Sequence, residues 1–186
     1  MPRANRPSNS TEAHVNILGA VLAGGKARRF GSDKAYALVD GERLIDRVSA
    51  ALAAQTQAVL VCGRDETGFE CIADRPDTGL GPLGGLNAAL HFAAGNGYNA
   101  VLSAGCDVHN LPTDLIDALA GSGPAIVQSQ PVIGLWPAAL APELDAFLAS
   151  GGRALYGFAE HVGARKVRFD PPLANVNTPG DLPGAH

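Results

Sequence analysis

The sequence predicts an α/β protein, with a mostly parallel β-sheet and helices on both of its faces. Two observations predict this class. Short apolar runs, such as those at 15–22 and 58–62, have the length and composition of strands buried on both faces. Segments with apolar residues at helical spacing alternate with these runs along the chain. Such alternation is typical of parallel strands joined by helices.

The first half of the chain supplies three strands and a helix in this interpretation. The first strand, 15–22, ends in glycines, and a polar loop at 23–34 follows it. A helix at about 43–55 is predicted from four apolar residues at helical spacing. They are Leu44, Ile45, Val48 and Leu52. Strands at 58–62 and 70–73 complete this half.

A glycine-rich turn at 79–85 introduces the second half. It opens onto a helix that carries Leu86, Leu90 and Phe92 and ends near Gly95. After a strand at 100–104, Pro112 starts a helix, since proline is well placed in a first turn. The remaining predicted strands are 125–127, 132–136 and 166–169, and the remaining predicted helices are 142–149 and 153–161.

Length and composition bound the function. The chain of 186 residues suits one domain at 15–186, preceded by a polar tail at 1–14 that we expect to be disordered. A formal net charge of -4 argues against nucleic acid as a partner. Three cysteines without a CxxC pair indicate neither a disulfide framework nor a zinc site. No signal peptide and no apolar run of about 20 residues is visible, so we expect a cytoplasmic protein without a membrane partner.

The loop after the first strand is rich in glycine and basic residues. Its sequence from Leu22 reads Leu-Ala-Gly-Gly-Lys-Ala-Arg-Arg-Phe-Gly-Ser-Asp-Lys, with four cations: Lys26, Arg28, Arg29 and Lys34. Glycines let backbone amides turn toward one point, and several cations can surround a triphosphate. Ala20 and Ala27 exclude a Walker A motif. The alternative is a solvated surface turn, but the loop favours a nucleoside triphosphate site.

Residues 79–84 match the G-x-G-x-x-G pattern of dinucleotide-binding proteins. The match is weak because five polar residues, 74–78, separate it from the preceding strand, whereas the true motif occupies a tight first turn. Pro82 also removes a backbone amide. We therefore expect this turn to shape the floor of a nucleotide pocket rather than to bind a nicotinamide or flavin dinucleotide.

Asp107 follows the strand at 100–104 at its carboxyl end. Mg²⁺ takes one or two protein carboxylates and completes its shell with phosphates and water. An aspartate facing a basic phosphate loop is suited to that role. The alternative is that Asp107 caps the helix predicted to start at Pro112, but Asp107 lies too far before that helix. The nearby His109 has no partner in view, and we interpret it as a polar residue on the surface of a loop.

Several motifs together resemble the molybdenum cofactor guanylyltransferases. The loop at 22–34 carries the strongest likeness. Other segments agree in order and spacing, from about Ile17 to Leu182: Gly81-Pro82-Leu83-Gly84-Gly85, Cys106-Asp107, Gln130-Pro131-Val132-Ile133-Gly134-Leu135 and Asn175-Val176-Asn177-Thr178-Pro179. The resemblance implies a three-layer, Rossmann-like fold of the GT-A nucleotidyltransferase type.

The resemblance also implies an activity. GMP would pass from MgGTP to the terminal phosphate of molybdopterin or Mo-molybdopterin, with pyrophosphate released and transient contacts with other proteins of cofactor biosynthesis. The attacking phosphate monoester is largely dianionic at neutral pH because its second pKa is about 6. It needs charge neutralisation and alignment rather than a general base.

Carried over onto this sequence, the family's roles fall on three sets of residues. Lys26, Arg29, Lys34 and Asp107 would act in transfer, with Asp107 holding Mg²⁺. The nucleotide would be bound by Leu22, Ala23, Gly24, Gly25, Lys26, Asp74, Gly81 and Asp107. The acceptor would be bound by Gln130, Asn175 and Asn177.

Gly24 favours GTP over CTP in this comparison, because cytidylyl-transferring relatives resemble the pattern but carry alanine there. A bare backbone would let a purine approach, and Asp74 could accept from guanine N1–H and N2–H₂. Three alternatives stay open: a relative that uses CTP, one that uses a sugar-phosphate acceptor, and a nucleotide-binding regulator without turnover.

Overall fold

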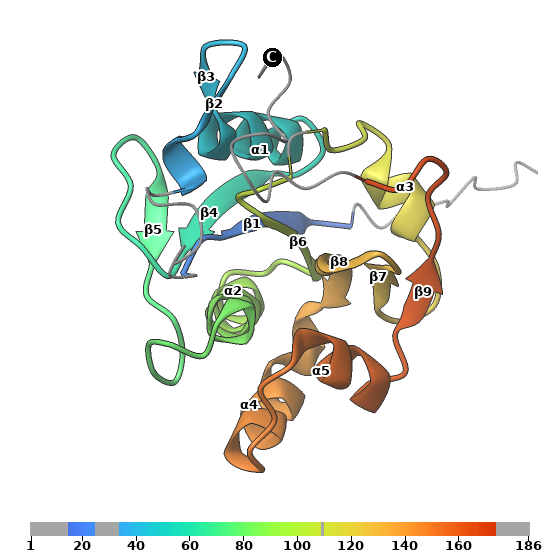
Figure 1. Ribbon diagram of the computed structural model, residues 1–186. Coiled ribbons are helices and arrows are strands. Elements are labelled where there is room, and N and C mark those ends of the chain that lie inside the picture. Colours follow the sequence, from blue (N-terminus) through green and yellow to red (C-terminus); the bar gives the residue numbers. More distant parts are fainter. Residues whose placement is uncertain (1–14, 25–33, 109, 174–186) are drawn as a thin grey trace, which may run out of the picture.

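The structure is a computed structural model that describes residues 15–24, 34–108 and 110–173. Seven strands form one sheet in the order β5-β4-β1-β6-β8-β7-β9 (Figure 1). These strands are β1 (Ile17–Leu22), β4 (Ala58–Cys62), β5 (Glu70–Ile72), β6 (Ala100–Gly105), β7 (Ala125–Val127), β8 (Gln130–Pro137) and β9 (Arg165–Val167). Only β8 runs against the other six, so the prediction of a mostly parallel sheet is confirmed.

Helices cover both faces of this sheet, as predicted. On one face lie α1 (Leu44–Ala53) and α3 (Leu115–Leu119). On the other lie α2 (Pro82–Gly95), α4 (Ala141–Ala149) and α5 (Leu155–His161) (Figure 1). A single-turn helix, η1 (Lys34–Tyr36), precedes α1, and a second, η2 (Ala138–Leu140), precedes α4.

Two hydrophobic cores follow from the alternation of side chains along the central strand. Leu18, Ala20 and Leu22 of β1 point into the core beneath α2, α4 and α5. Ile17 and Val21 point into the opposite core, beneath α1 and α3. Side chains that alternate between two buried faces explain why the run reads as continuously apolar.

Several predicted boundaries differ in the structure. Val15 is outside the first strand, which begins at Ile17. The third α-helix, α3, begins at Leu115 rather than Pro112. The reason is that the Gln55 side chain donates to the Pro112 carbonyl at 2.9 Å and accepts from the Ile116 amide at 3.3 Å, which holds the intervening segment outside the helix. Finally, α2 already begins at Pro82, inside the predicted glycine-rich turn.

A small hairpin between η1 and α1 was missed by the prediction. It consists of β2 (Leu38–Val39) and β3 (Glu42–Arg43), joined by Asp40 and Gly41. Both turn residues have positive φ, 53° and 83°, as a tight two-residue hairpin requires. The Asp-Gly pair was therefore the available signal.

Candidate functional site at the carboxyl edge of the sheet

The carboxyl ends of four neighbouring parallel strands meet at one edge of the sheet. Leu22, the last residue of β1, lies beside Cys62 of β4 on one side and Gly105 of β6 on the other. Cys62 in turn lies beside Ile72, the last residue of β5. Because the four strands end in register, the segments that follow them leave the sheet side by side. Ligands of open α/β sheets bind beyond such an edge.

Three of the predicted site residues leave this edge at matching positions. Gly24, Asp74 and Asp107 each come two residues after the end of their strand, on β1, β5 and β6 respectively. Neighbouring strands lie about 4.8 Å apart, so the main chains at the ends of β5 and β6 are separated by three spacings, roughly 14 Å. Gly24 lies between them. The segments after β5 and β6 thus each carry an aspartate, and the segment after β1 between them carries a glycine.

The carboxylate of Asp74 is enclosed by glycines. A Cβ atom added to Gly24 would lie 2.8 Å from Asp74 Oδ2, and one added to Gly63 would lie 2.5 Å from Oδ1. On the other side, a Cβ atom on Gly84 would approach the Asp74 Cβ atom to 3.0 Å. These glycines come from the segments after β1 and β4 and from α2, three parts of the chain far apart in sequence. Their missing side chains make the space that Asp74 occupies.

Asp74 has an unsatisfied hydrogen-bond acceptor in this setting. Its Oδ1 atom is buried and has no hydrogen-bond partner among the described residues. Burial disfavours the charged form and raises the pKa of the Asp74 carboxyl above its ordinary value. Leaving a buried acceptor unpaired costs about 1–3 kcal/mol, so the fold holds this carboxylate in place at a cost to stability.

The structure gives Gly24 a packing reason that the sequence did not reveal. Besides Asp74, a Cβ atom at Gly24 would meet the Cα atom of Gly63 at 3.3 Å. Gly63 itself has φ of 84°, which favours glycine. It was not predicted as a site residue, although a glycine directly after the buried strand at 58–62 was a signal. A glycine is therefore needed at position 24 so that the Asp74 carboxylate can pack against the backbone there, whether or not a nucleotide also binds.

Leu22 and Ala23 can meet a nucleotide only through their main chain. Their side chains are buried in the two cores, and the Ala23 amide already donates to the Cys62 carbonyl at 3.0 Å. Any contact of these two residues with a nucleotide is therefore limited to their backbone.

Cys62, at the end of β4, is part of the core. Burial raises the pKa of its thiol, and the charge of Asp74 raises it further, so this cysteine stays protonated.

Asp107 is partly buried at the end of β6. A Cβ atom on Gly105 would lie 2.7 Å from Asp107 Oδ1, so the carboxylate folds back over the end of its own strand. Val108, the next residue, is buried and anchors the segment in the core beneath α1. The carboxylate is thus held at the edge of the sheet by packing on both sides.

The donor set at Asp107 suits a magnesium ion that arrives with phosphates. Among the described residues, no group of three or more histidines, cysteines or acids could hold a metal. A metal that needs an all-protein shell does not fit this part of the molecule. Mg²⁺ is commonly held by one or two carboxylates together with substrate phosphates and water. A single Asp107 carboxylate meets that requirement.

Gly81 precedes α2 with φ of 61°, and a Cβ atom there would meet nothing within 4 Å. Its requirement for glycine is conformational, and its Cα face is open to a ligand. The third glycine of the G-x-G-x-x-G match is Gly84. The Asp74 side chain fills the space that a Cβ atom on Gly84 would need. This close approach of the protein's own carboxylate explains the glycine without any dinucleotide.

Several predicted residues cannot be placed. Gly25, Lys26, Arg28, Arg29, His109, Asn175 and Asn177 lie outside the described residues, as does the tail at 1–14. Lys34 is described only through its backbone, which opens η1. Their predicted contacts with phosphates and acceptor stay predictions.

Gln130, predicted to bind the acceptor, is buried at the start of β8 and exposes 7% of its surface. Its Nε2 atom donates to the Leu173 carbonyl at 2.5 Å, whereas its Oε1 atom has no partner among the described residues. Gln130 therefore fastens the chain just before the segment that carries Asn175 and Asn177. This contact supports a structural role beside the predicted one.

A cluster around Glu66 holds η1, which follows the basic loop. Glu66 exposes only 7% of its surface and accepts from the Tyr36 hydroxyl at 2.9 Å and from Arg43 Nη1 at 2.8 Å. The guanidinium of Arg64 lies 4.9 Å from the centre of the Tyr36 ring, within cation–π range. Arg64 follows Gly63 at the edge, so this cluster joins the end of the loop to the end of β4.

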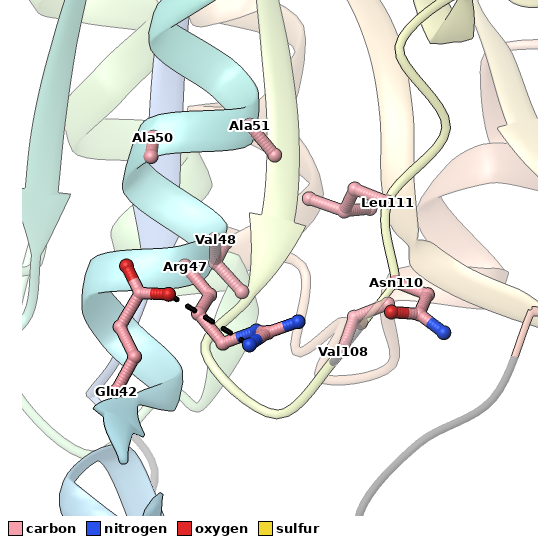
Figure 2. Close-up of a pocket in the computed structure, with 8 residues that line it drawn as sticks. All are labelled: Glu42, Arg47, Val48, Ala50, Ala51, Val108, Asn110 and Leu111. Atoms are coloured by element: carbon pink, nitrogen blue, oxygen red, sulfur yellow. Dashed lines mark ion pairs between the residues drawn. The ribbon is translucent and has the colours of Figure 1, made fainter. Parts of the chain in front are cut away.

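A cavity of about 280 Å³ lies between α1 and the segment that follows Asp107 (Figure 2). Arg47 reaches across it from α1, and Val108, Asn110 and Leu111 line the opposite wall. The Arg47 guanidinium lies 3.7 Å from Glu42 and 3.5 Å from Asp40, so its charge is partly neutralised. None of the predicted site residues that the structure describes lines this cavity.

Comparisons with known proteins identify relatives of this chain. Residues 19–164 match the model of the MobA-like NTP transferase domain. The chain is 40% identical over 181 residues to a molybdenum cofactor guanylyltransferase of Rhodobacter capsulatus, covering 90% of this chain and 94% of the relative. Among the helices of the described chain, none is long and apolar enough to span a bilayer.

Solved structures show the same fold at lower identity. Molybdopterin-guanine dinucleotide biosynthesis protein A from Archaeoglobus fulgidus matches with a TM-score of 0.71 and 22% identity, covering 89% of this chain and 94% of that chain. A 2-C-methyl-D-erythritol 4-phosphate cytidylyltransferase from Thermus thermophilus matches with a TM-score of 0.65 and 16% identity, covering 90% and 95%. The nucleotidyltransferase fold expected from the sequence is confirmed, and the chain belongs to the MobA-like NTP transferase family.

Proposed function

We propose that this chain is a molybdenum cofactor guanylyltransferase, which transfers GMP from MgGTP to the terminal phosphate of molybdopterin or Mo-molybdopterin. The observation that carries the proposal is the placement of Asp74 and Asp107 on one edge, with Gly24 between them. It is supported by the 40% identity to a relative of that name over 90% of the chain.

The base would be bound at the Asp74 end of the edge. Guanine presents N1–H and N2–H₂ side by side, and a carboxylate can accept from both. Cytosine presents no such pair of donors, and the corresponding edge of adenine has a single amino group beside an acceptor nitrogen. A carboxylate at the base, which Asp74 would supply, therefore favours GTP over CTP and ATP.

The phosphates would be bound at the Asp107 end. Asp107 would hold Mg²⁺, which supplies positive charge to the triphosphate when it is bound. Lys26, Arg29 and Lys34 of the loop would neutralise the departing pyrophosphate. The acceptor phosphate oxygen attacks the α-phosphorus of GTP, a new P–O bond forms, and the bond to the β-phosphate bridge oxygen breaks. The residues align two polyanions and suppress their repulsion, which is the main requirement of phosphoryl transfer.

The acceptor would lie toward Gln130, Asn175 and Asn177. We place the reaction in the cytoplasm, because three cysteines without a disulfide suit a reducing compartment. Transient contacts with other proteins of cofactor biosynthesis would deliver the pterin.

A pyrophosphate-release assay tests the proposal. The full chain is incubated with Mg²⁺, molybdopterin and GTP, CTP or ATP, and a sugar phosphate replaces molybdopterin in a parallel arm. We expect release with GTP and molybdopterin, and at least about a 100-fold loss in Lys26→Ala, since one charge-stabilising donor is worth 10²–10³. Equal release with CTP would move the assignment to a cytidylyltransferase. Nucleotide binding without turnover on any acceptor would favour a regulator.

A further inference from the structure

A polar network centred on the buried Asn87 lies next to the segment that carries Asp74. It joins Asn87 and His91 of α2 to Asp145 of α4 and to Arg75, the residue directly after Asp74. The network is outside every segment that the family resemblance singled out. Because it connects three segments that are distant in sequence, it calls for a physical explanation.

Asn87 is the centre of this network. It is a polar residue that exposes none of its surface, and its neighbours on α2, such as Leu83 and Leu90, are apolar core residues. Its Nδ2 atom donates to Asp145 Oδ1 at 2.8 Å and lies 3.4 Å from the Arg75 carbonyl oxygen. Burying an amide costs free energy unless its hydrogen bonds are made. An apolar side chain would fill this place at lower cost, so the amide has a role other than filling space.

Asp145 holds Asn87 in position. Its second carboxylate oxygen, Oδ2, lies 2.8 Å from His91 Nε2, one helical turn along α2 from Asn87, and 3.6 Å from Arg75 Nη2. Partial burial raises the pKa of the Asp145 carboxyl, but hydrogen bonds from Asn87 and His91 lower it by more, so the group stays charged. A charged acceptor that is bound by two side chains of one helix restricts the rotamer of each.

The network is connected to Asp74 through the backbone of Arg75. Arg75 is held at both of its backbone polar groups: its amide donates to the Gly84 carbonyl at 3.1 Å, and its carbonyl faces the Asn87 amide. Asp74 itself contacts α2 at Gly84. The Asp74 carboxylate, by contrast, makes no hydrogen bond through Oδ1 that would hold it within the described chain. Its position therefore depends on the glycines that enclose it and on the backbone that carries it.

We propose that Asn87, Asp145 and His91 are positioning residues that fix the carboxylate of Asp74 and thereby set the discrimination of guanine from other purines. The inference rests on the proposed role of Asp74 in binding guanine. Hypoxanthine keeps N1–H but lacks N2–H₂, so the contrast between GTP and ITP reports the fit of this carboxylate.

The test compares dissociation constants of MgGTP and MgITP for the full-length protein by titration calorimetry. We expect the wild type to bind GTP at least about tenfold more tightly than ITP, a difference typical of one good hydrogen bond. Asn87→Ala should reduce that ratio to about threefold or less, mainly by weakening GTP. Asp145→Asn, which leaves a half-exposed and isosteric side chain, should reduce it in the same direction.

Glu143→Gln is the matched control. It also removes a carboxylate of α4 that pairs with a histidine, His161 at 2.7 Å, but this pair is exposed and has no link to Asp74. It should leave the ratio unchanged. Melting temperatures of all variants separate positioning from loss of fold. If Asn87→Ala is too unstable to measure, Asp145→Asn decides alone.

Two outcomes would overturn the inference, and they differ. If the wild type prefers GTP and both Asn87→Ala and Asp145→Asn keep that preference, the network serves packing only. If the wild type does not distinguish GTP from ITP, and Asp74→Asn does not change either affinity, the base contact itself is wrong and the proposed function fails with it.

Discussion

Replacing Gly24 with alanine perturbs the approach between Asp74 and the backbone that follows β1. The added Cβ atom would lie 2.8 Å from Asp74 Oδ2, about 0.6 Å inside the 3.4 Å at which ordinary contact begins. It would also lie 3.3 Å from the Gly63 Cα atom, which is tight but tolerable. The atom that must yield is the end of a side chain, so the Asp74 carboxylate rotates while the main chain stays in place.

The expected effect falls on nucleotide binding more than on stability. A carboxylate displaced by about half an ångström loses the best part of its charge-assisted hydrogen bonds to guanine, each worth about 1.5–3 kcal/mol. GTP affinity should therefore fall by roughly 10–100-fold. A local cost of no more than about 1 kcal/mol should lower the melting temperature by roughly 2–4 °C. Affinity for CTP, which does not use this contact, should change less than threefold.

The assay is titration of MgGTP and MgCTP against wild type and Gly24→Ala, with melting curves recorded in parallel. Gly95→Ala is the matched control, because a Cβ atom there meets nothing within 4 Å. Gly63→Ala gives the opposite extreme: its φ is 84°, and its Cβ atom would lie 2.6 Å from the Gly24 Cα atom, so this variant should lose fold as well as binding. An unchanged GTP-to-CTP ratio in a folded Gly24→Ala protein would refute the reasoning.

Three other substitutions have defined outcomes. Asp107→Asn should lower pyrophosphate release from MgGTP by at least about 100-fold while the melting temperature stays within about 2 °C, and full activity would refute its metal role. Asp74→Asn should raise the melting temperature at pH 7. The reason is that a carboxyl whose folded pKa is raised by burial binds its proton more tightly when folded, so wild-type stability falls as pH rises through the ordinary value of 3.8 toward the raised one. Melts at pH 3 and pH 7 should show the gain only at pH 7, and an equal gain at both would contradict this cause. Glu66→Ala should cost about 1–3 kcal/mol by leaving Tyr36 and Arg43 without their buried acceptor, which urea unfolding measures, and a cost near zero would show that the cluster does not hold η1.

Local pattern was sufficient for most of the secondary structure. The strands at 58–62 and 125–127 were predicted at the bounds that the structure has, because a run buried on both faces is visible without knowledge of its neighbours. The start of α3 was predicted three residues early, since the side chain of Gln55, sixty residues away, holds the chain outside the helix. Contacts of that kind leave no local pattern.

The sequence by itself determined the class of fold, the approximate places of the strands in the main sheet and the residue types that follow two of them: a basic loop after β1 and an aspartate after β6. These properties follow from hydrophobic periodicity and from residue chemistry, both of which are local. Only the tertiary structure decided that Asp74 lies among glycines of β1, β4 and α2, and that Asn87 and Asp145 stand behind it. Close approach between distant segments depends on register and packing, which no single stretch of the chain encodes.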